Sequence, residues 1–169
     1  IKAQEYARKR EAKDEAKRPG RDLRLEAILR GLDGTQPFLV TVNRQQDIIS
    51  ALRLAQEFKI KLILDGCADA PLVLPEIKAS GFPVIVHPTM QRSYQDMQNL
   101  SVETAAKLHD AGIPIALQSS YESYVPKTRV VLLEAAVAAA NGLGFEPALA
   151  SITLDAAQLL GIADRTGSL

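Results

Sequence analysis

The sequence predicts an α/β fold built on a parallel sheet, and three observations support this prediction. Four short apolar segments rich in β-branched residues recur along the chain, at residues 38–42, 62–64, 84–86 and 115–117. Their starts are 24, 22 and 31 residues apart, which is room for a strand, a crossover helix and two loops each time. Each apolar segment also runs into polar residues at its carboxyl end, where α/β proteins place their sites.

The region before the first strand is predicted to form two helices. Residues 2–18 combine good helix formers with charges of both signs, and Pro19 and Gly20 end the pattern. Because acidic residues interleave with basic ones, we interpret this segment as a solvated helix rather than a nucleic-acid arm. Asp22 is predicted to cap a second helix, whose apolar side includes Leu25 and Leu29.

Four βα units follow, at about residues 37–58, 61–80, 83–111 and 113–141, and further helices run to residue 161. Pro75 must shorten or kink the helix predicted over residues 70–80. Ser101 is predicted to cap a helix over 101–111, and Thr153 to cap one over 153–160. A long helix is predicted over 128–141 and a short one over 146–151. No linker interrupts the pattern, so residues 1–169 are assigned to a single domain.

Composition excludes two classes of partner. Lys plus Arg and Asp plus Glu both number 20, and this neutral balance favours neither nucleic acid nor an acidic membrane surface. No apolar run reaches the roughly 20 residues that span a bilayer. A single cysteine, Cys67, cannot form an internal disulfide, so the cysteine content does not indicate the cellular compartment.

The first three strand ends each carry one candidate site residue. Asn43 either binds a substrate or caps the helix that begins near residue 46. Asp65 is either a catalytic base or metal ligand, or the anchor of a helix start or turn. His87 is either a catalytic or metal-binding residue, or a hydrogen-bonded structural histidine.

The fourth strand end carries substrate-binding candidates. These are Ser119 and Ser120, followed by Tyr121 and Glu122 on a loop that also contains Tyr124 and Lys127. In a barrel such a loop either lines the pocket or covers the barrel mouth. The serines lack the Gly-x-Ser-x-Gly context of a nucleophile elbow, which disfavours a serine hydrolase. Cys67 is interpreted as a small buried thiol rather than a nucleophile.

The chain resembles a known enzyme family in three places. The segment SITLDAAQLLGIADRTGSL (151–169) is similar to the last barrel helix of amidohydrolases of the imidazolonepropionase-like group. A second similarity is DIISALRLAQEFKIKLIL (47–64), which resembles the family's helix and strand between its fifth and sixth barrel positions. A third is GIPIALQSS (112–120), which resembles its eighth strand. The resemblance implies the C-terminal half, strands 5–8, of a metal-dependent-hydrolase-type (β/α)8 TIM barrel. It also implies hydrolysis of non-peptide C–N bonds in cyclic amides or related substrates.

The same resemblance indicates where metal ligands would fall. The histidine positions of the fifth and sixth strands fall on Asn43 and Gly66, and the aspartate position of the eighth on Ser119 and Ser120. Asparagine binds transition metals poorly, glycine has no side chain, and serine is no carboxylate base near neutral pH. We therefore expect no metal or other cofactor from this segment. Zinc or another divalent ion is expected only if an N-terminal half supplies the ligands.

A half-barrel would leave two open sheet edges and an uncovered inner face. We therefore expect the remaining half of the same barrel, a second copy in a homo-oligomer, or rearrangement to an open sheet to complete it. A small molecule is the expected ligand. Two further functions stay open: a metal-free binding protein or pseudoenzyme on the same barrel, and a doubly wound sheet with a nucleotide crevice. No Gly-rich loop follows any strand, which disfavours the latter.

Overall fold

A four-stranded parallel sheet is the centre of the molecule. The computed structural model describes residues 2–12, 18–93, 95–122 and 125–168. Strands β1 (Phe38–Val42), β2 (Leu62–Gly66), β3 (Val84–Val86) and β4 (Ile115–Leu117) lie side by side in chain order. All three pairings are parallel, so the carboxyl ends of the strands meet at one edge. The predicted α/β fold with a parallel sheet is confirmed.

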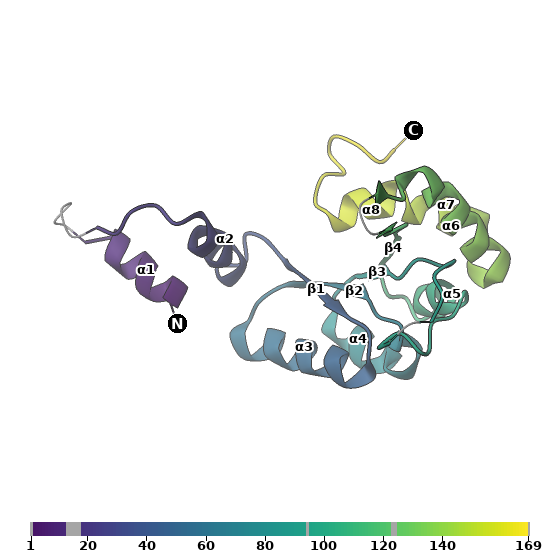
Figure 1. The fold of residues 1–169 in the computed structure, drawn as a ribbon, viewed down its shortest axis with the longest axis horizontal. Helices are drawn as coiled ribbons and strands as arrows, with labels where there is room; N and C mark the ends of the chain where they lie inside the picture. Colours follow the sequence, from purple (N-terminus) through teal and green to yellow (C-terminus); the bar gives the residue numbers. More distant parts are fainter. Residues whose placement is uncertain (1, 13–17, 94, 123–124, 169) are drawn as a thin grey trace.

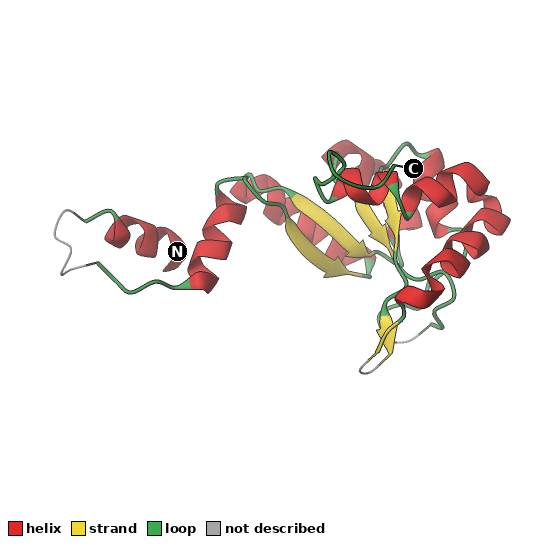
Figure 2. Cartoon of the chain, turned by 90° about the horizontal axis from the view of Figure 1, so that it is seen from above, coloured by secondary structure: helices red, strands yellow, loops and turns green. Residues whose placement is uncertain are grey.

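Helices connect the strands and complete the chain (Figure 1). The α-helices are α1 (Lys2–Arg10), α2 (Leu23–Leu32), α3 (Gln45–Phe58), α4 (Leu74–Ser80), α5 (Thr104–Asp110), α6 (Val131–Ala138), α7 (Phe145–Ser151) and α8 (Leu154–Leu159). Shorter helical turns are η2 (Ala70–Leu72), η3 (Thr128–Val130) and η4 (Ala139–Leu143). A small antiparallel hairpin, β5 (Tyr121–Glu122) with β6 (Val125–Pro126), projects from the body of the molecule (Figure 2). None of the described helices combines the length and apolarity needed to cross a bilayer.

The first two helices extend away from the sheet as an arm (Figure 1). Within the arm, the backbone N–H of Asp22 donates to the Tyr6 hydroxyl at 3.0 Å. The arm meets the sheet where Gly31 of α2 lies on the ring of Phe38. A Cβ at Gly31 would stand 2.1 Å from Cζ of that ring, so only glycine allows this approach. Helix α2 is thereby fixed against the first strand.

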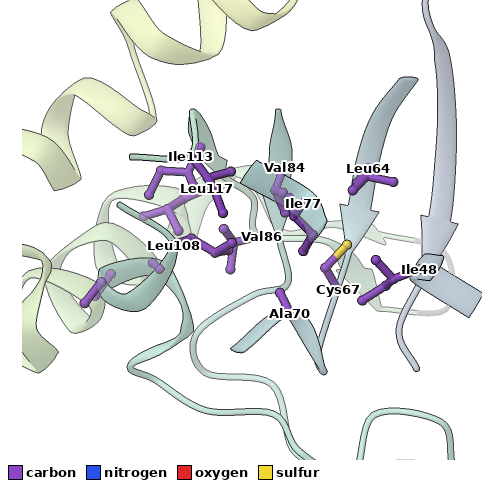
Figure 3. Packing of buried hydrophobic residues seen from close by; sticks show 14 of the residues in the cluster. Ile48, Leu64, Cys67, Ala70, Ile77, Val84, Val86, Leu108, Ile113 and Leu117 are labelled. Atoms are coloured by element: carbon purple, nitrogen blue, oxygen red, sulfur yellow. The ribbon is translucent and has the colours of Figure 1, made fainter. Parts of the chain in front are cut away.

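The core lies between the sheet and the helices that follow its strands. Leu64, Val84 and Val86 are fully buried, and they pack with Ile48 of α3 and Ile77 of α4 (Figure 3). Full burial of such side chains stabilises the fold by roughly 1.5–3 kcal/mol each. Because strand side chains alternate between faces, this packing directs the intervening residues to the opposite face of the sheet.

That opposite face is open at β1 and partly covered at the other strands. Leu39 of β1 is 60% exposed, whereas its partner Ile63 on β2 is 5% exposed. One row further along, the register aligns Thr41, Asp65, Ile85 and Ala116. In this row, the residues on β1 and β2 are polar and those on β3 and β4 are apolar.

Several predicted helices differ from the observed ones near their ends. The helix predicted over 2–18 is α1, which ends at Arg10, and residues 13–17 lie outside the described residues. The segment 70–80 divides at Val73 into η2 and α4, and Pro75 occupies the first turn of α4. The segment 128–141 likewise divides into η3, α6 and η4.

Three predicted caps had different outcomes. Asp22 caps α2 as expected, because its carboxylate accepts from the backbone N–H groups of Arg24 and Leu25. Ser101 caps only a turn, with its hydroxyl accepting from Glu103 N, and α5 starts later, at Thr104. Thr153 precedes α8, but its hydroxyl donates backwards to the Leu149 carbonyl at 2.7 Å. A serine or threonine hydroxyl can donate as well as accept, so residue type alone did not fix these bonds.

Candidate functional site

The four strand ends with site candidates lie at one edge of the sheet, as predicted. Asn43 follows β1, Asp65 lies in β2, His87 follows β3 and Ser120 comes shortly after β4. The ladder even continues past β3, because His87 N donates to the Gly66 carbonyl at 2.9 Å. The side chains nevertheless divide into two groups with different surroundings.

Asp65 is the centre of the first group, on the open face of the sheet. Thr41 Oγ1 donates to Asp65 Oδ2 at 2.7 Å, and Gln118 Nε2 donates to Asp65 Oδ1 at 2.7 Å. The three side chains come from β1, β2 and the residue after β4, and Asp65 itself is half-buried. Both carboxylate oxygens are thus held in place while the group still reaches solvent. The alternative interpretation of Asp65 as a turn anchor is wrong.

Asn43 does not cap the helix that follows it, so that interpretation is also wrong. Helix α3 begins after Arg44, and its first N–H, from Gln45, donates to Asp69 Oδ2 at 2.9 Å. The anchoring role expected of Asp65 and the capping role expected of Asn43 both belong to Asp69. Sequence reasoning assigned Asp69 neither role, because this cap comes from the end of a different strand.

Asn43 instead links the end of β1 to the loop that follows β3. Its Nδ2 donates to Asp96 Oδ2 at 3.1 Å, and a second link joins Asn99 Nδ2 to Asp69 Oδ1 at 2.9 Å. Its buried Oδ1 has no hydrogen-bond partner among the described residues. The loop after β3 is therefore tied to the ends of the first two strands.

The same Asn43 oxygen lies directly over Gly66. A Cβ at Gly66 would be 2.5 Å from Asn43 Oδ1, and the Gly66 backbone has φ +86°, which L-residues rarely adopt. Glycine at this position is required by both its backbone conformation and its neighbour. The metal-ligand position that the resemblance implies for the sixth strand is filled by the Asn43 carboxamide.

His87 belongs to the second group, which is buried. It is 1% exposed, and Nδ1 donates to the Pro88 carbonyl oxygen at 3.0 Å. Nε2 then carries the lone pair, and it has no partner among the described residues. Burial lowers the pKa of His87, against the opposing effects of the Pro88 carbonyl and the Glu134 carboxylate. The structure therefore favours a neutral His87 at pH 7.

Glu134 of α6 is the second buried polar residue in this group, at 2% exposure. Its Oε2 accepts from Thr89 Oγ1 at 2.5 Å and from Met90 N at 2.9 Å. These bonds fasten the start of the loop after β3 to helix α6. The sequence contains one signal for this role, since Glu134 is the single charge within the apolar run 130–140. Sequence reasoning did not select Glu134.

The fourth strand end carries the remaining candidates. Ser119 is buried and Ser120 is exposed, with a left-handed backbone at φ +57°. Tyr121 and Glu122 form β5, and their side chains, like all of Tyr124, lie outside the described residues. No described contact joins Ser119 or Ser120 to Asp65.

Cys67 follows β2 in the apolar interior, next to Ile48 and Leu64 (Figure 3). Burial, with a smaller effect from the Asp65 carboxylate, raises the pKa of its thiol to about 12. A thiol with this pKa is not a nucleophile near neutral pH, in agreement with its interpretation as a buried apolar residue.

The residues at this edge do not fit a metal centre. Within the described ranges, no three His, Cys, Asp or Glu side chains come together closely enough to hold an ion. Both oxygens of Asp65 accept hydrogen bonds from protein side chains, Asn43 Nδ2 donates to Asp96, and Gly66 offers no ligand. These residues therefore supply no ligand set for a metal ion.

The solved structures similar to this chain include two enzymes and an uncharacterised protein. An amidohydrolase from Thermotoga maritima MSB8 matches 99% of the chain with 30% sequence identity and a TM-score of 0.87. An adenosine deaminase from Xanthomonas campestris with bound zinc matches 86% with 19% identity and a TM-score of 0.54. An uncharacterised protein matches 80% with 13% identity and a TM-score of 0.58. No family model and no curated protein matches the chain.

The first of these matches supports the amidohydrolase superfamily. The adenosine deaminase and the uncharacterised protein share the fold alone, because their identities are low. This chain spans 44% of the Thermotoga protein and 36% of each of the other two. It thus corresponds to less than half of each neighbour.

Proposed function

We propose that this chain is part of an amidohydrolase-like enzyme that hydrolyses non-peptide C–N bonds in cyclic amides or related substrates. The observation that carries the proposal is the match of nearly the whole chain to the Thermotoga amidohydrolase. The Asp65 cluster supports it, since it puts a solvent-accessible carboxylate at the carboxyl edge of a parallel sheet.

The proposed architecture is strands 5–8 of a (β/α)8 barrel of the imidazolonepropionase-like kind. Two features support it: the Thermotoga protein is more than twice as long as this chain, and the open face of β1 exposes Leu39. A further set of strands, from the same polypeptide or from a second copy, would cover that face and pair with both sheet edges.

Asp65 is the proposed catalytic base. As a water molecule attacks the amide carbonyl, its oxygen forms a bond to the carbonyl carbon and its proton passes to the Asp65 carboxylate. The C–N bond then breaks, and the nitrogen takes a proton as it leaves, which returns Asp65 to its ionised form. Thr41 and Gln118 hold the carboxylate in position by donating to both of its oxygens. Asn43, Ser119 and Ser120, with Tyr121 and Glu122, are the proposed substrate-binding residues.

The test is ring opening of a panel of cyclic amides, which adds one water to the mass of the substrate. The purified protein is compared with Asp65→Asn, and Asp47→Asn on the exposed side of α3 is the matched control. Loss of a general base should slow turnover by about 100-fold or more, whereas the control should keep full activity. Turnover that survives Asp65→Asn would contradict the proposed role of Asp65.

A metal-free binding protein on the same barrel is the second candidate. It is favoured by the replaced ligand positions at Asn43, Gly66 and Ser119–Ser120, and by the two side-chain donors that already occupy Asp65. Binding of a cyclic amide without ring opening would support this candidate over the enzyme. Neither binding nor turnover across the panel would contradict both.

The metal prediction has its own measurement. Elemental analysis of the purified protein should find no stoichiometric transition metal held by this chain. A full-occupancy zinc, iron or nickel ion in contact with position 43, 66 or 120 would contradict it.

A further inference from the structure

A second polar cleft, separate from the Asp65 cluster, opens beyond the ends of β3 and β4. It has a volume of about 420 Å³, which is within the range of small-molecule sites. Its lining comes from the loop after β3, the residues after β4, η3 and α6, and consists of Pro88, Met90, Gln91, Ser119, Ser120, Lys127, Arg129, Val130 and Glu134. Thr41, Asp65 and Gln118 do not line it.

Ser119 is the first sign that this cleft receives a polar ligand. The residue is 6% exposed and lines the cleft. A serine hydroxyl can donate one hydrogen bond and accept others, so it suits a ligand oxygen.

Two cationic side chains line the same cleft. Lys127 N donates to the Ser120 carbonyl at 3.0 Å, which closes the loop that contains the β5–β6 hairpin and puts position 127 beside position 120. Val130 N then donates to the Lys127 carbonyl at 2.8 Å, which winds the chain into η3 and brings Arg129 to the cleft. A guanidinium presents parallel N–H donors that match the oxygens of a carboxylate or phosphate.

Glu134 does not cancel this positive character. Its Oε2 accepts hydrogen bonds from Thr89 Oγ1 and Met90 N, so the carboxylate holds the wall of the cleft together. The Arg129 guanidinium, by contrast, lies on an exposed residue of the lining. Pro88, Met90 and Val130 add apolar wall, which suits a compact organic body attached to an anionic group.

We propose that this cleft binds a small oxyanion, a carboxylate or phosphate carried on a compact organic molecule. Arg129 binds its charge, and the Ser119 hydroxyl donates to one of its oxygens. The cleft shares Ser119 and Ser120 with the proposed substrate-binding residues, but none of the Asp65 cluster lines it and binding requires no turnover, so the two proposals can fail separately.

The test is equilibrium titration of the protein with inorganic phosphate and, separately, with benzoate, at constant ionic strength. Arg129→Gln should weaken binding about tenfold or more, because a hydrogen bond to a charged group is lost. Ser119→Ala should weaken it about threefold or more, as expected for a single neutral donor. Tighter binding of phosphate or of benzoate identifies which oxyanion the cleft prefers, and either result supports the proposal.

Arg53→Gln is the matched control, because Arg53 is an exposed arginine on α3, outside this cleft. It should leave both affinities unchanged. Arg129 is exposed, so its variant should keep the circular dichroism spectrum of the parent protein. The proposal is overturned if neither anion binds, if Arg129→Gln binds as tightly as the parent, or if Arg53→Gln weakens binding equally.

Discussion

Two threonine–carboxylate hydrogen bonds join distant parts of the described chain, and their surroundings differ. Thr41 donates to Asp65 at 2.7 Å on the open face of the sheet, and Thr89 donates to Glu134 at 2.5 Å in the buried region beyond β3. The donor and acceptor chemistry is the same in both. The first pair is accessible to water and therefore to a substrate, whereas the second is buried and holds the loop after β3 in place. Burial, rather than residue type, separates a candidate catalytic carboxylate from a structural one.

Thr89→Val should have the larger effect of the two matched substitutions. Valine keeps the shape of the side chain but removes a donor to a buried carboxylate, at a cost of about 2–3 kcal/mol in the free energy of unfolding. Urea denaturation at pH 7, with an unchanged m-value, measures the loss. A cost within about 0.5 kcal/mol, the range of ordinary surface substitutions, would show that the buried bond is no stronger than an exposed one.

The pH dependence of the unfolding free energy tests the buried region around His87. Its pKa in the folded protein is lowered from 6.5, so below about pH 6.5 the unfolded chain binds a proton that the folded chain resists. Stability should therefore fall as the pH drops below 6.5, by up to about 1.4 kcal/mol per pH unit from this one group. Unfolding free energies between pH 7.5 and 5 measure the slope.

His87→Gln should flatten that slope, because glutamine does not titrate. His109→Gln is the matched control, since it removes the other histidine of the chain at an exposed position on α5. Equal slopes for the parent and His87→Gln would mean that His87 takes up a proton equally well in both states.

Thr41→Val should have the smallest effect, below about 1 kcal/mol, because water can replace the lost donor and Gln118 still binds Asp65. Valine also suits a strand position. Urea denaturation at pH 7 measures this change in the free energy of unfolding, which is then compared with the change for Thr89→Val. A cost equal to that of Thr89→Val would remove the distinction between the two sites.

The sequence predicted local features of this fold well and long-range contacts poorly. Periodicity and β-branched content located all four strands to within two residues, and glycine marked the end of α4. The bonds that build the site join residues far apart in the chain: Gln118 to Asp65 and Asn43 to Asp96 are each separated by 53 positions. No local pattern encodes such pairs, because they depend on which strands become neighbours.

Asp69 illustrates the same limit. A residue that caps a helix usually lies just before it, and on that basis Asn43 was the natural candidate for α3. The actual donor–acceptor pair, Gln45 and Asp69, crosses from one strand end to the next. Recognising it requires the parallel pairing of β1 and β2, which composition and spacing suggest but do not specify residue by residue.

The contact between Asn43 and Gly66 restricts the order in which these two positions can be redesigned. A histidine placed at position 66 would bring its Cβ to 2.5 Å from Asn43 Oδ1, on a backbone whose φ of +86° already disfavours any side chain. An engineer who wishes to build imidazole ligands into this edge must therefore displace the Asn43 side chain first and rebuild the end of β2 second. The reverse order passes through a variant in which both obstacles are present at once.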